Sequence, residues 1–270
     1  MSEPTPLTTG DGRKAILELD DVSIRFGGVA ALDSVSFDIK QGEILGLIGP
    51  NGAGKTTCFN VMTGVYQATS GSVRFDGQEL AGRKRHDITK LGIARTFQNI
   101  RLFKSMTALE NVMVGADARS KVGLLNALFR TPLHRRTEAE AEKEAFELLD
   151  FVGVSGRADE LAENLSYGDQ RRLEIARAMA TKPQLLCLDE PAAGFNPAEK
   201  QRLMDLIRKV RDEGYTVLLI EHDMRLVMGV TDRIVVLEFG RKIAEGTPAE
   251  IRDNPAVIAA YLGVDEDDAS

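Results

Sequence analysis

The most constraining feature of this chain is an eight-residue string, Gly49-Pro50-Asn51-Gly52-Ala53-Gly54-Lys55-Thr56. It directly follows the apolar run 44–48 and precedes a segment of helical character. Glycines at this spacing let successive backbone N–H groups point at one anion, and a helix N-terminus adds partial positive charge. Lys55 then reaches the β- and γ-phosphates, and the Thr56 hydroxyl takes a Mg²⁺ position. The sequence therefore predicts a phosphate loop between a buried strand and a helix.

The candidate phosphate contacts share this loop and the first turn of the helix after it: Gly49, Asn51, Gly52, Ala53, Gly54, Lys55, Thr56 and Thr57. Thr57, the next hydroxyl, is placed to bond the α-phosphate. The alternative is a glycine-rich turn that arose by chance. The strand before the loop and the helix after it favour phosphate binding, because the mechanism needs that context.

Composition narrows the class of protein further. The chain has 270 residues, a net charge of −7, 43% hydrophobic and 28% charged residues, which is the balance of a folded globular protein. The acidic balance argues against a nucleic-acid binder that relies on a basic surface. Cys58 and Cys187 lie in apolar stretches and fit a reducing compartment. No apolar run spans a bilayer and no secretory signal is visible, so we expect a cytoplasmic protein that meets membranes only peripherally.

Two kinds of strand pattern predict an α/β fold. The segments 16–19, 22–26 and 35–39 alternate between apolar and polar residues, which favours an antiparallel sheet with one wet face. The runs 44–48, 185–188 and 217–220 are continuously apolar, which is typical of a parallel sheet buried on both faces. Between the last two lies a helical pattern that Asn196 is placed to cap, so this region predicts a βαβ unit.

The rest of the chain divides into a helical middle and a short C-terminal part. From about 107 to 181 we expect helices and no strand, with a capping box at Thr137–Glu140 that opens one helix and a helix over 173–180. A hairpin over 233–244 and helices over 248–252 and 255–262 complete the pattern. We expect a flexible leader over 1–14, one main domain over 15–255 with a helical subdomain at about 100–180, and a C-terminal helix with an acidic tail over 256–270.

A pair of carboxylates, Asp189 and Glu190, ends the apolar run 185–188. The carboxyl end of a parallel strand faces the crevice where α/β sheets bind ligands. Asp189 there can hold Mg²⁺, and Glu190 can orient or deprotonate an attacking water. The alternative is two solvated acids at a strand end, which would be the commoner case without a phosphate loop upstream.

A further string identifies a family. Leu165-Ser166-Tyr167-Gly168-Asp169 resembles the LSGGQ signature of ATP-binding-cassette (ABC) ATPases. The order of motifs also fits: phosphate loop, Gln98 at a strand end, signature, Asp189-Glu190, then His222 after a strand. No motif after the phosphate loop is specific alone, but the five in this order are. The resemblance covers residues 16–245 and implies a P-loop NTPase core of the RecA-like type with an antiparallel β subdomain and a helical subdomain that carries the signature.

The resemblance implies ATP and Mg²⁺ as cofactors and assigns further roles. Gln98 would sense Mg²⁺ and the γ-phosphate, and His222 would contact the γ-phosphate. Phe26 stands where the family places an aromatic that stacks on adenine, although an aromatic in an alternating strand is more often part of the core. Ser166 and Gly168 would meet the γ-phosphate bound by a second subunit, because two such domains sandwich two nucleotides.

Three positions depart from the commonest pattern: Tyr167 and Asp169 in the signature, and Asn196 where an aspartate is usual. We expect the Asp169 side chain to face away from the phosphate, because an acid there would repel it. With these departures and the ending 245–263, the sequence resembles those of the ATP-binding subunits of branched-chain amino acid importers. The lipopolysaccharide-export ATPase remains an alternative, as does a soluble ABC ATPase of repair or translation. A phosphate-loop kinase would leave the signature unexplained.

The resemblance also implies partners: a second ABC ATPase, identical or paralogous, an integral membrane permease and, indirectly, a periplasmic solute-binding protein, with no nucleic acid. It places the chain at the cytoplasmic face of the inner membrane. Basic residues and leucines over 119–136 form either a surface near the membrane or an ordinary packed helix. The segment 99–103 is the better candidate for permease docking, with Leu102 and Phe103 as an exposed apolar pair, unless they belong to the core. The transported solute cannot be predicted from this chain.

Overall fold

The structure is a computed structural model that describes residues 12–117 and 132–262. The chain divides into two compact units, one formed by residues 1–93 and 184–270 and the other by residues 94–183. The first unit contains two sheets and the helices that cover them, and the second contains helices. No helix in the described ranges is both long and apolar enough to cross a membrane.

The smaller sheet is antiparallel, as the alternating pattern predicts. Its strands run in the order β2 (Val29–Lys40), β1 (Ala15–Phe26), β4 (Ser70–Phe75) and β5 (Gln78–Glu79). The separate strands expected over 16–19 and 22–26 are one continuous strand, β1. The pairing with β2 shifts register between Leu19 and Val22, where Asp21 has a φ of 51°. This irregularity interrupts the alternation without ending the strand.

The larger sheet contains the three apolar runs. Its order is β10 (Arg241–Gly246), β9 (Arg233–Glu238), β3 (Ile44–Ile48), β8 (Thr216–Ile220), β7 (Leu185–Asp189) and β6 (Ile93–Arg95). The strands β3, β7 and β8 are parallel, as expected, and β9 joins them in parallel next to β3. The predicted hairpin is β9 with β10. β6 is the place where the chain passes from the first unit to the second.

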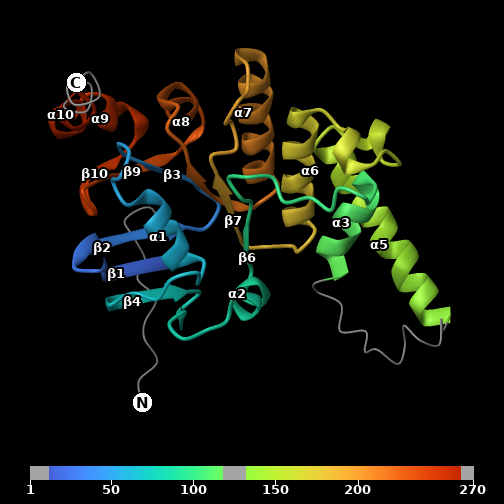
Figure 1. Cartoon of the computed structure of the whole chain (residues 1–270), viewed down its shortest axis with the longest axis horizontal. Helices are drawn as coiled ribbons and strands as arrows, with labels where there is room; N and C mark the ends of the chain where they lie inside the picture. Colours follow the sequence, from blue (N-terminus) through green and yellow to red (C-terminus); the bar gives the residue numbers. More distant parts are fainter. Residues whose placement is uncertain (1–11, 118–131, 263–270) are drawn as a thin grey trace. The chain divides into compact units, whose positions relative to one another are not determined.

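Both faces of the larger sheet are covered, which explains the unbroken apolar runs. On β9, Ile234 and Val236 join a cluster with α8 (Met224–Val230), α9 (Pro248–Arg252) and α10 (Pro255–Leu262). Val235 and Leu237 face the opposite cluster, which contains α1 (Lys55–Met62) and the antiparallel sheet. Figure 1 shows α1 between the two sheets and α8 to α10 on the other side of β9.

Capping residues fix the helix ends of the first unit where the sequence predicts them. α7 (Pro197–Asp212) begins after Asn196, whose side chain accepts from the Glu199 N–H in a capping box. A second capping box, Thr247 with Glu250, opens α9. The short helices α9 and α10 have the predicted bounds, while α2 (Arg85–Leu91) is a helix that the sequence patterns did not indicate.

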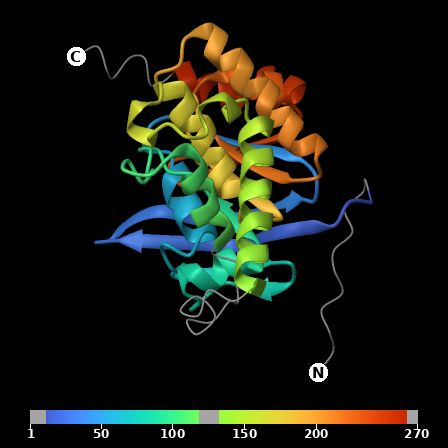
Figure 2. The same ribbon diagram turned by 90° about the vertical axis from the view of Figure 1, so that its right-hand side faces the viewer.

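The second unit consists of α3 (Ala108–Asp117), α5 (Pro132–Phe151) and α6 (Tyr167–Met179), with short 3-10 turns at Ser155–Arg157 and Ala162–Asn164. The three helices pack against one another, and they lie side by side in both views (Figures 1 and 2). Within the described part of this unit after residue 107, the only β pairing is an isolated bridge between Thr107 and Leu161. For the described residues between 107 and 181, the expectation of a helical middle is confirmed.

Two expected helix starts are wrong. α5 begins at Pro132 and not at Thr137, because proline is favoured in the first turn of a helix and the capping-box pattern lies inside it. The helix expected over 173–180 begins at Tyr167, directly after Ser166. The signature residues Tyr167, Gly168 and Asp169 therefore lie in the first turn of α6, and Ser166 caps it. Most of the basic stretch 119–136, the leader through residue 11 and the acidic tail lie outside the described residues.

Candidate functional site

The phosphate loop has the geometry that its glycines permit. β3 ends at Ile48 and α1 begins at Lys55. Gly49 has a φ of 151°, and a Cβ there would lie 2.1 Å from the carbonyl oxygen of Leu237. Gly54 has a φ of 97°, and a Cβ there would lie 2.6 Å from the carbonyl oxygen of Ala31. Both close approaches exclude a side chain, so the loop packs tightly on its neighbours while Asn51, Gly52 and Thr56 remain exposed.

Lys55 lies folded against this loop. Its ammonium group donates to the carbonyl oxygens of Gly49 at 2.7 Å and Pro50 at 2.8 Å, and the residue is 8% exposed. Burial lowers the pKa of Lys55, and the negative charge of Glu190 opposes that effect. The ammonium group is therefore held at the loop within the electrostatic reach of Glu190.

The order of the parallel strands brings the candidate catalytic residues to one sheet edge. β3, β8 and β7 are neighbours, and their carboxyl ends continue into the phosphate loop, His222 and Glu190, respectively. His222 Nδ1 lies 4.0 Å from Glu190 Oε1. Such an edge is where open α/β sheets bind ligands. The structure thus brings Lys55, Glu190 and His222 together from three distant parts of the sequence.

Glu190 has an unusual backbone conformation for a residue with a side chain, with a φ of 46°. Its N–H donates to the carbonyl oxygen of Ile220 at 2.9 Å, which fixes the peptide against the end of β8. Non-glycine residues in this region of φ are uncommon and occur often at functional sites. The Glu190 carboxylate that extends from this turn lies beside His222.

Thr56 and Asp189 are the candidate Mg²⁺ ligands in this unit. A hydroxyl and a carboxylate are the hard oxygen donors that Mg²⁺ prefers, and Asp189 is 6% exposed at the end of β7. No cluster of three or more His, Cys, Asp or Glu side chains that could hold a metal exists among the described residues. The donor set fits an ion that shares its coordination with phosphate oxygens.

The buried Glu221 is a residue of this edge that the sequence analysis did not single out. It is 1% exposed, and its carboxylate accepts from the N–H groups of Ala192 at 2.8 Å and His222 at 3.2 Å. Burial raises the pKa of Glu221. Its bonds join the loop after Glu190 to the loop that carries His222. The sequence does carry a signal for this residue, because Glu221 directly follows the apolar run 217–220.

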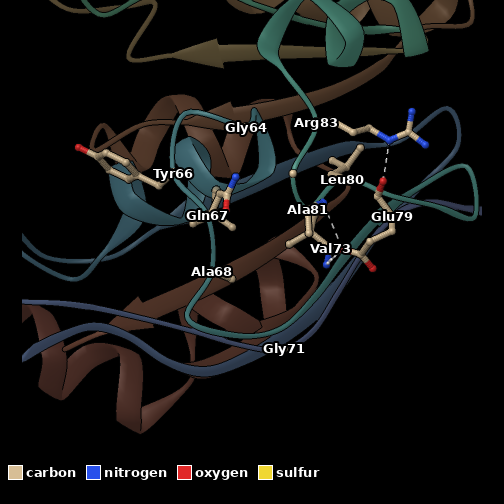
Figure 3. A pocket seen from close by; sticks show the side chains of 12 residues that line it. Gly64, Tyr66, Gln67, Ala68, Gly71, Val73, Glu79, Leu80, Ala81 and Arg83 are labelled. Carbon is tan, nitrogen blue, oxygen red and sulfur yellow. Dashed lines mark hydrogen bonds between the residues drawn. The ribbon is translucent and has the colours of Figure 1, made fainter.

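Phe26 belongs to the surface and not to the core, because it is 46% exposed. Its ring meets the ring of Tyr66 edge-to-face, with centroids 5.2 Å apart. Tyr66 also lines a small pocket of about 80 Å³ in the antiparallel part of the unit. Figure 3 shows its ring extending away from Glu79 and Arg83 on the opposite wall. That pocket is too small for a nucleotide, whereas the exposed face of Phe26 suits a stacked base.

The remaining predicted residues, Gln98, Ser166 and Gly168, belong to the second unit. Gln98 is exposed in the loop after β6, and Ser166 is the exposed N-cap of α6. The Ser166 hydroxyl accepts from the N–H of Asp169 and donates to its carboxylate at 2.8 Å.

The Asp169 side chain is buried, and Arg172 forms an ion pair with it. Ser166 and Arg172 thus hold the Asp169 carboxylate in the first turn of α6, and its expected orientation away from a bound phosphate stays a prediction.

Models of known protein families match the sequence of this chain. The family model for ABC transporters matches residues 32–193, which include the phosphate loop, Gln98, the signature and Glu190. The chain belongs to the ABC transporter family. A second model, for the branched-chain amino acid ATP-binding cassette transporter, matches residues 241–267 of this ABC protein. The predicted membership and the α/β fold with a P-loop core are therefore confirmed.

Individual relatives agree with the family. The ABC protein is 51% identical, over 93% of its length and 98% of the relative's, to the high-affinity branched-chain amino acid transport ATP-binding protein BraF of Pseudomonas aeruginosa. It resembles the crystal structure of MJ1267, an ATP-binding cassette of an ABC transporter in its ADP conformation, with a TM-score of 0.80, 34% identity and coverage of 92% and 99%. The dimeric post-hydrolysis state of the cassette MJ0796, bound to ADP and phosphate, gives a TM-score of 0.72 at 27% identity and coverage of 86% and 98%.

Proposed function

We propose that this chain is the subunit that binds and hydrolyses ATP in an importer of branched-chain or other hydrophobic amino acids. The observation that carries the proposal is the high identity to a branched-chain amino acid transport protein over nearly the whole of both chains. The match of the C-terminal segment 241–267 supports amino acid import over other ABC systems. The convergence of Lys55, Glu190 and His222 at one sheet edge supplies residues that suit hydrolysis.

In this proposal each residue of the edge has one task. The N–H groups of the loop and the start of α1 bind the phosphate chain, and Lys55 exchanges its carbonyl partners for the β- and γ-phosphates. Glu190 orients the attacking water, and His222 beside it contacts the γ-phosphate. Thr56 and Asp189 would hold Mg²⁺, which would neutralise phosphate charge, and Gln98 is proposed to sense the ion. Ser166 and Gly168 serve the nucleotide of a second subunit.

Phe26 provides a test of base recognition. We expect Phe26→Ala to weaken ATP binding about tenfold, because stacking of a base on an aromatic ring contributes about 1–3 kcal/mol. Phe26→Tyr should retain most of the affinity. Binding of inorganic tripolyphosphate, which has no base, should be the same in all three proteins. Equilibrium titrations with both ligands make the comparison, and equal weakening for tripolyphosphate would show that Phe26 supports the loop and not the base.

The loop after Gln98 is the proposed docking surface for a membrane permease at the cytoplasmic face of the inner membrane. Phe103 is 47% exposed and therefore not part of the core, and the Arg177 guanidinium lies over its ring at 5.6 Å. Leu102 lines an adjacent pocket of about 210 Å³ with Asn99, Ile100, Lys104, Ala162, Tyr167 and Gln170. A hollow lined by both apolar and polar side chains suits an amphipathic helix of a partner.

Uptake by the assembled transporter tests the function. We expect the chain, purified with the permease that accompanies it from native membranes and placed in vesicles, to drive ATP-dependent uptake of leucine supplied with its binding protein. Lysine, which is charged, should not accumulate. Phe103→Asp should abolish both co-purification and uptake, because a carboxylate opposes apolar docking. Phe146→Asp, on α5 and 48% exposed, is the matched control and should retain both. Association with ribosomes or DNA instead of a permease would contradict the proposal.

A further inference from the structure

A buried arginine of α6 binds the backbone of the loop that contains Gln98. Arg171 is 2% exposed, and its guanidinium donates to the carbonyl oxygen of Phe97 at 2.6 Å and to that of Gln98. The two carbonyls are consecutive, so the planar fork of the guanidinium closes on both. An arginine held in this way fixes the direction of the peptide between Phe97 and Gln98.

Glu174, one helical turn further along α6, binds the backbone of the same loop. It is 2% exposed and pairs with Arg171 at 3.1 Å. Its other carboxylate oxygen accepts from the N–H of Phe97 at 3.3 Å and from that of Arg101 at 3.5 Å. Burial raises the pKa of Glu174, while the Arg171 charge and the two N–H groups oppose that effect. The pair therefore binds both N–H and C=O groups of an irregular backbone segment, 97–101.

The same guanidinium also reaches the signature. Arg171 lies over the ring of Tyr167 at 5.6 Å and donates to its hydroxyl at 3.2 Å. Tyr167 stands between Ser166 and Gly168 in the first turn of α6, and it is 47% exposed where it lines the docking pocket with Leu102. The buried guanidinium of Arg171 thus bonds both the Gln98 loop and Tyr167, the atypical signature residue. Residues from both segments line that pocket.

Stability alone does not explain such a pair. Removing two charges from water costs free energy, and apolar residues of similar volume often replace a buried ion pair without loss of stability. What apolar residues cannot do is bond the N–H and C=O groups of residues 97–101. The distinctive contribution of the pair is therefore to hold an irregular loop in one orientation relative to a helix.

We propose that Arg171 and Glu174 are positioning residues that lock the Gln98 loop onto the signature helix, so that Gln98 and the Ser166 end of α6 move as one body. The inference rests on the proposed role of Gln98 at the γ-phosphate. A partner seated against Tyr167 and Leu102 would then act on Gln98 and on the signature together, instead of on each alone.

A double-mutant cycle on ATP hydrolysis tests the lock. We expect Gln98→Ala to lower kcat about tenfold in the wild-type background, and by less than about twofold when Arg171→Met and Glu174→Met are also present, because coupled residues are non-additive. The paired substitution fills the site with apolar side chains, so the chain should still fold, with some loss of thermal stability because backbone groups of residues 97–101 lose their partners. Arg171→Lys keeps the charge but lacks the planar guanidinium, so in this background Gln98→Ala should lower kcat by a factor between those two values. This single variant takes the place of the paired variant if the latter does not fold.

The matched control is the exposed ion pair of Lys143 and Glu147 on α5, in the same unit. With both of these changed to Met, Gln98→Ala should again lower kcat about tenfold, since distant sites are additive. An equal effect of Gln98→Ala with and without the Arg171–Glu174 pair would overturn the inference. If the wild-type chain hydrolyses no ATP, the proposed function itself has failed, so the two failures are distinguishable.

Discussion

Glu190→Gln is expected to bind ATP as tightly as the wild-type chain and to hydrolyse it about 10²–10⁴ times more slowly, the range typical for loss of a general base. Glutamine has nearly the same size, and the Glu190 peptide is fixed by its bond to Ile220, so the amide should occupy the position of the carboxylate. It lacks the charge that orients and deprotonates water. Equilibrium titration with ATP and single-turnover hydrolysis measure the two quantities.

The same variant should trap a dimer. If two chains close around ATP and separate after hydrolysis, then a chain that binds but cannot hydrolyse should accumulate in the closed state. Sedimentation with ATP and Mg²⁺ should show a dimer for Glu190→Gln and mainly monomer for the wild type. Glu213→Gln, an exposed acid at the end of α7, is the control and should hydrolyse normally. Near-normal turnover by Glu190→Gln would refute the role assigned to this residue.

The parts of the site that the sequence predicted lie next to strand ends. Unbroken apolar runs predict buried parallel strands, and polar residues at their carboxyl ends meet at one edge whatever the exact sheet order. That is why Asp189 and Glu190 could be placed near the phosphate loop, whereas the role of His222 was implied by the order of motifs in the family that the sequence resembles. Caps are equally local signals, as Asn196 illustrates.

The parts that the sequence did not predict depend on contacts between distant residues. Arg171 bonds the carbonyl of Phe97 across 74 positions, and Glu221 bonds the N–H of Ala192 across 29. Neither bond follows from periodicity, because both link a side chain to irregular backbone. A charged residue in a helix or after a strand normally indicates a solvated face, and only its burial in the fold gives it another role.

The helix starts failed for a different reason. The Thr137–Glu140 pattern satisfies a capping box, but the same four residues are compatible with a helix interior once Pro132 has started the helix. At the signature, the helix was expected from Leu173, yet Ser166 caps α6 and Asp169 lies in its first turn. Local propensity gives way where a cap and packing support the helix.

Lys55→Ala is expected to lower the affinity for ATP about 10²-fold, since a hydrogen bond to a charged group contributes about 1.5–3 kcal/mol and more than one is lost. The ammonium group now donates to the Gly49 and Pro50 carbonyls, so the side chain is already directed along the loop that receives the phosphates. Lys55→Arg should not restore binding, because a planar fork cannot replace a compact charge in a buried position. Equilibrium dialysis with labelled ATP measures the affinities.

A matched ligand separates phosphate binding from collapse of the loop. Adenosine has the base but no phosphate, so its weak binding at Phe26 should be equal in the wild type and in Lys55→Ala. Loss of the hydrogen bonds from Lys55 to the Gly49 and Pro50 carbonyls will also loosen the loop, yet the bonds that join Ala53 to Gly240 and Cys58 to Gly54 remain and should hold its C-terminal end. The selective loss of ATP over adenosine is then the effect of one charge. Tight ATP binding by Lys55→Ala would mean that the backbone cradle alone holds the phosphates.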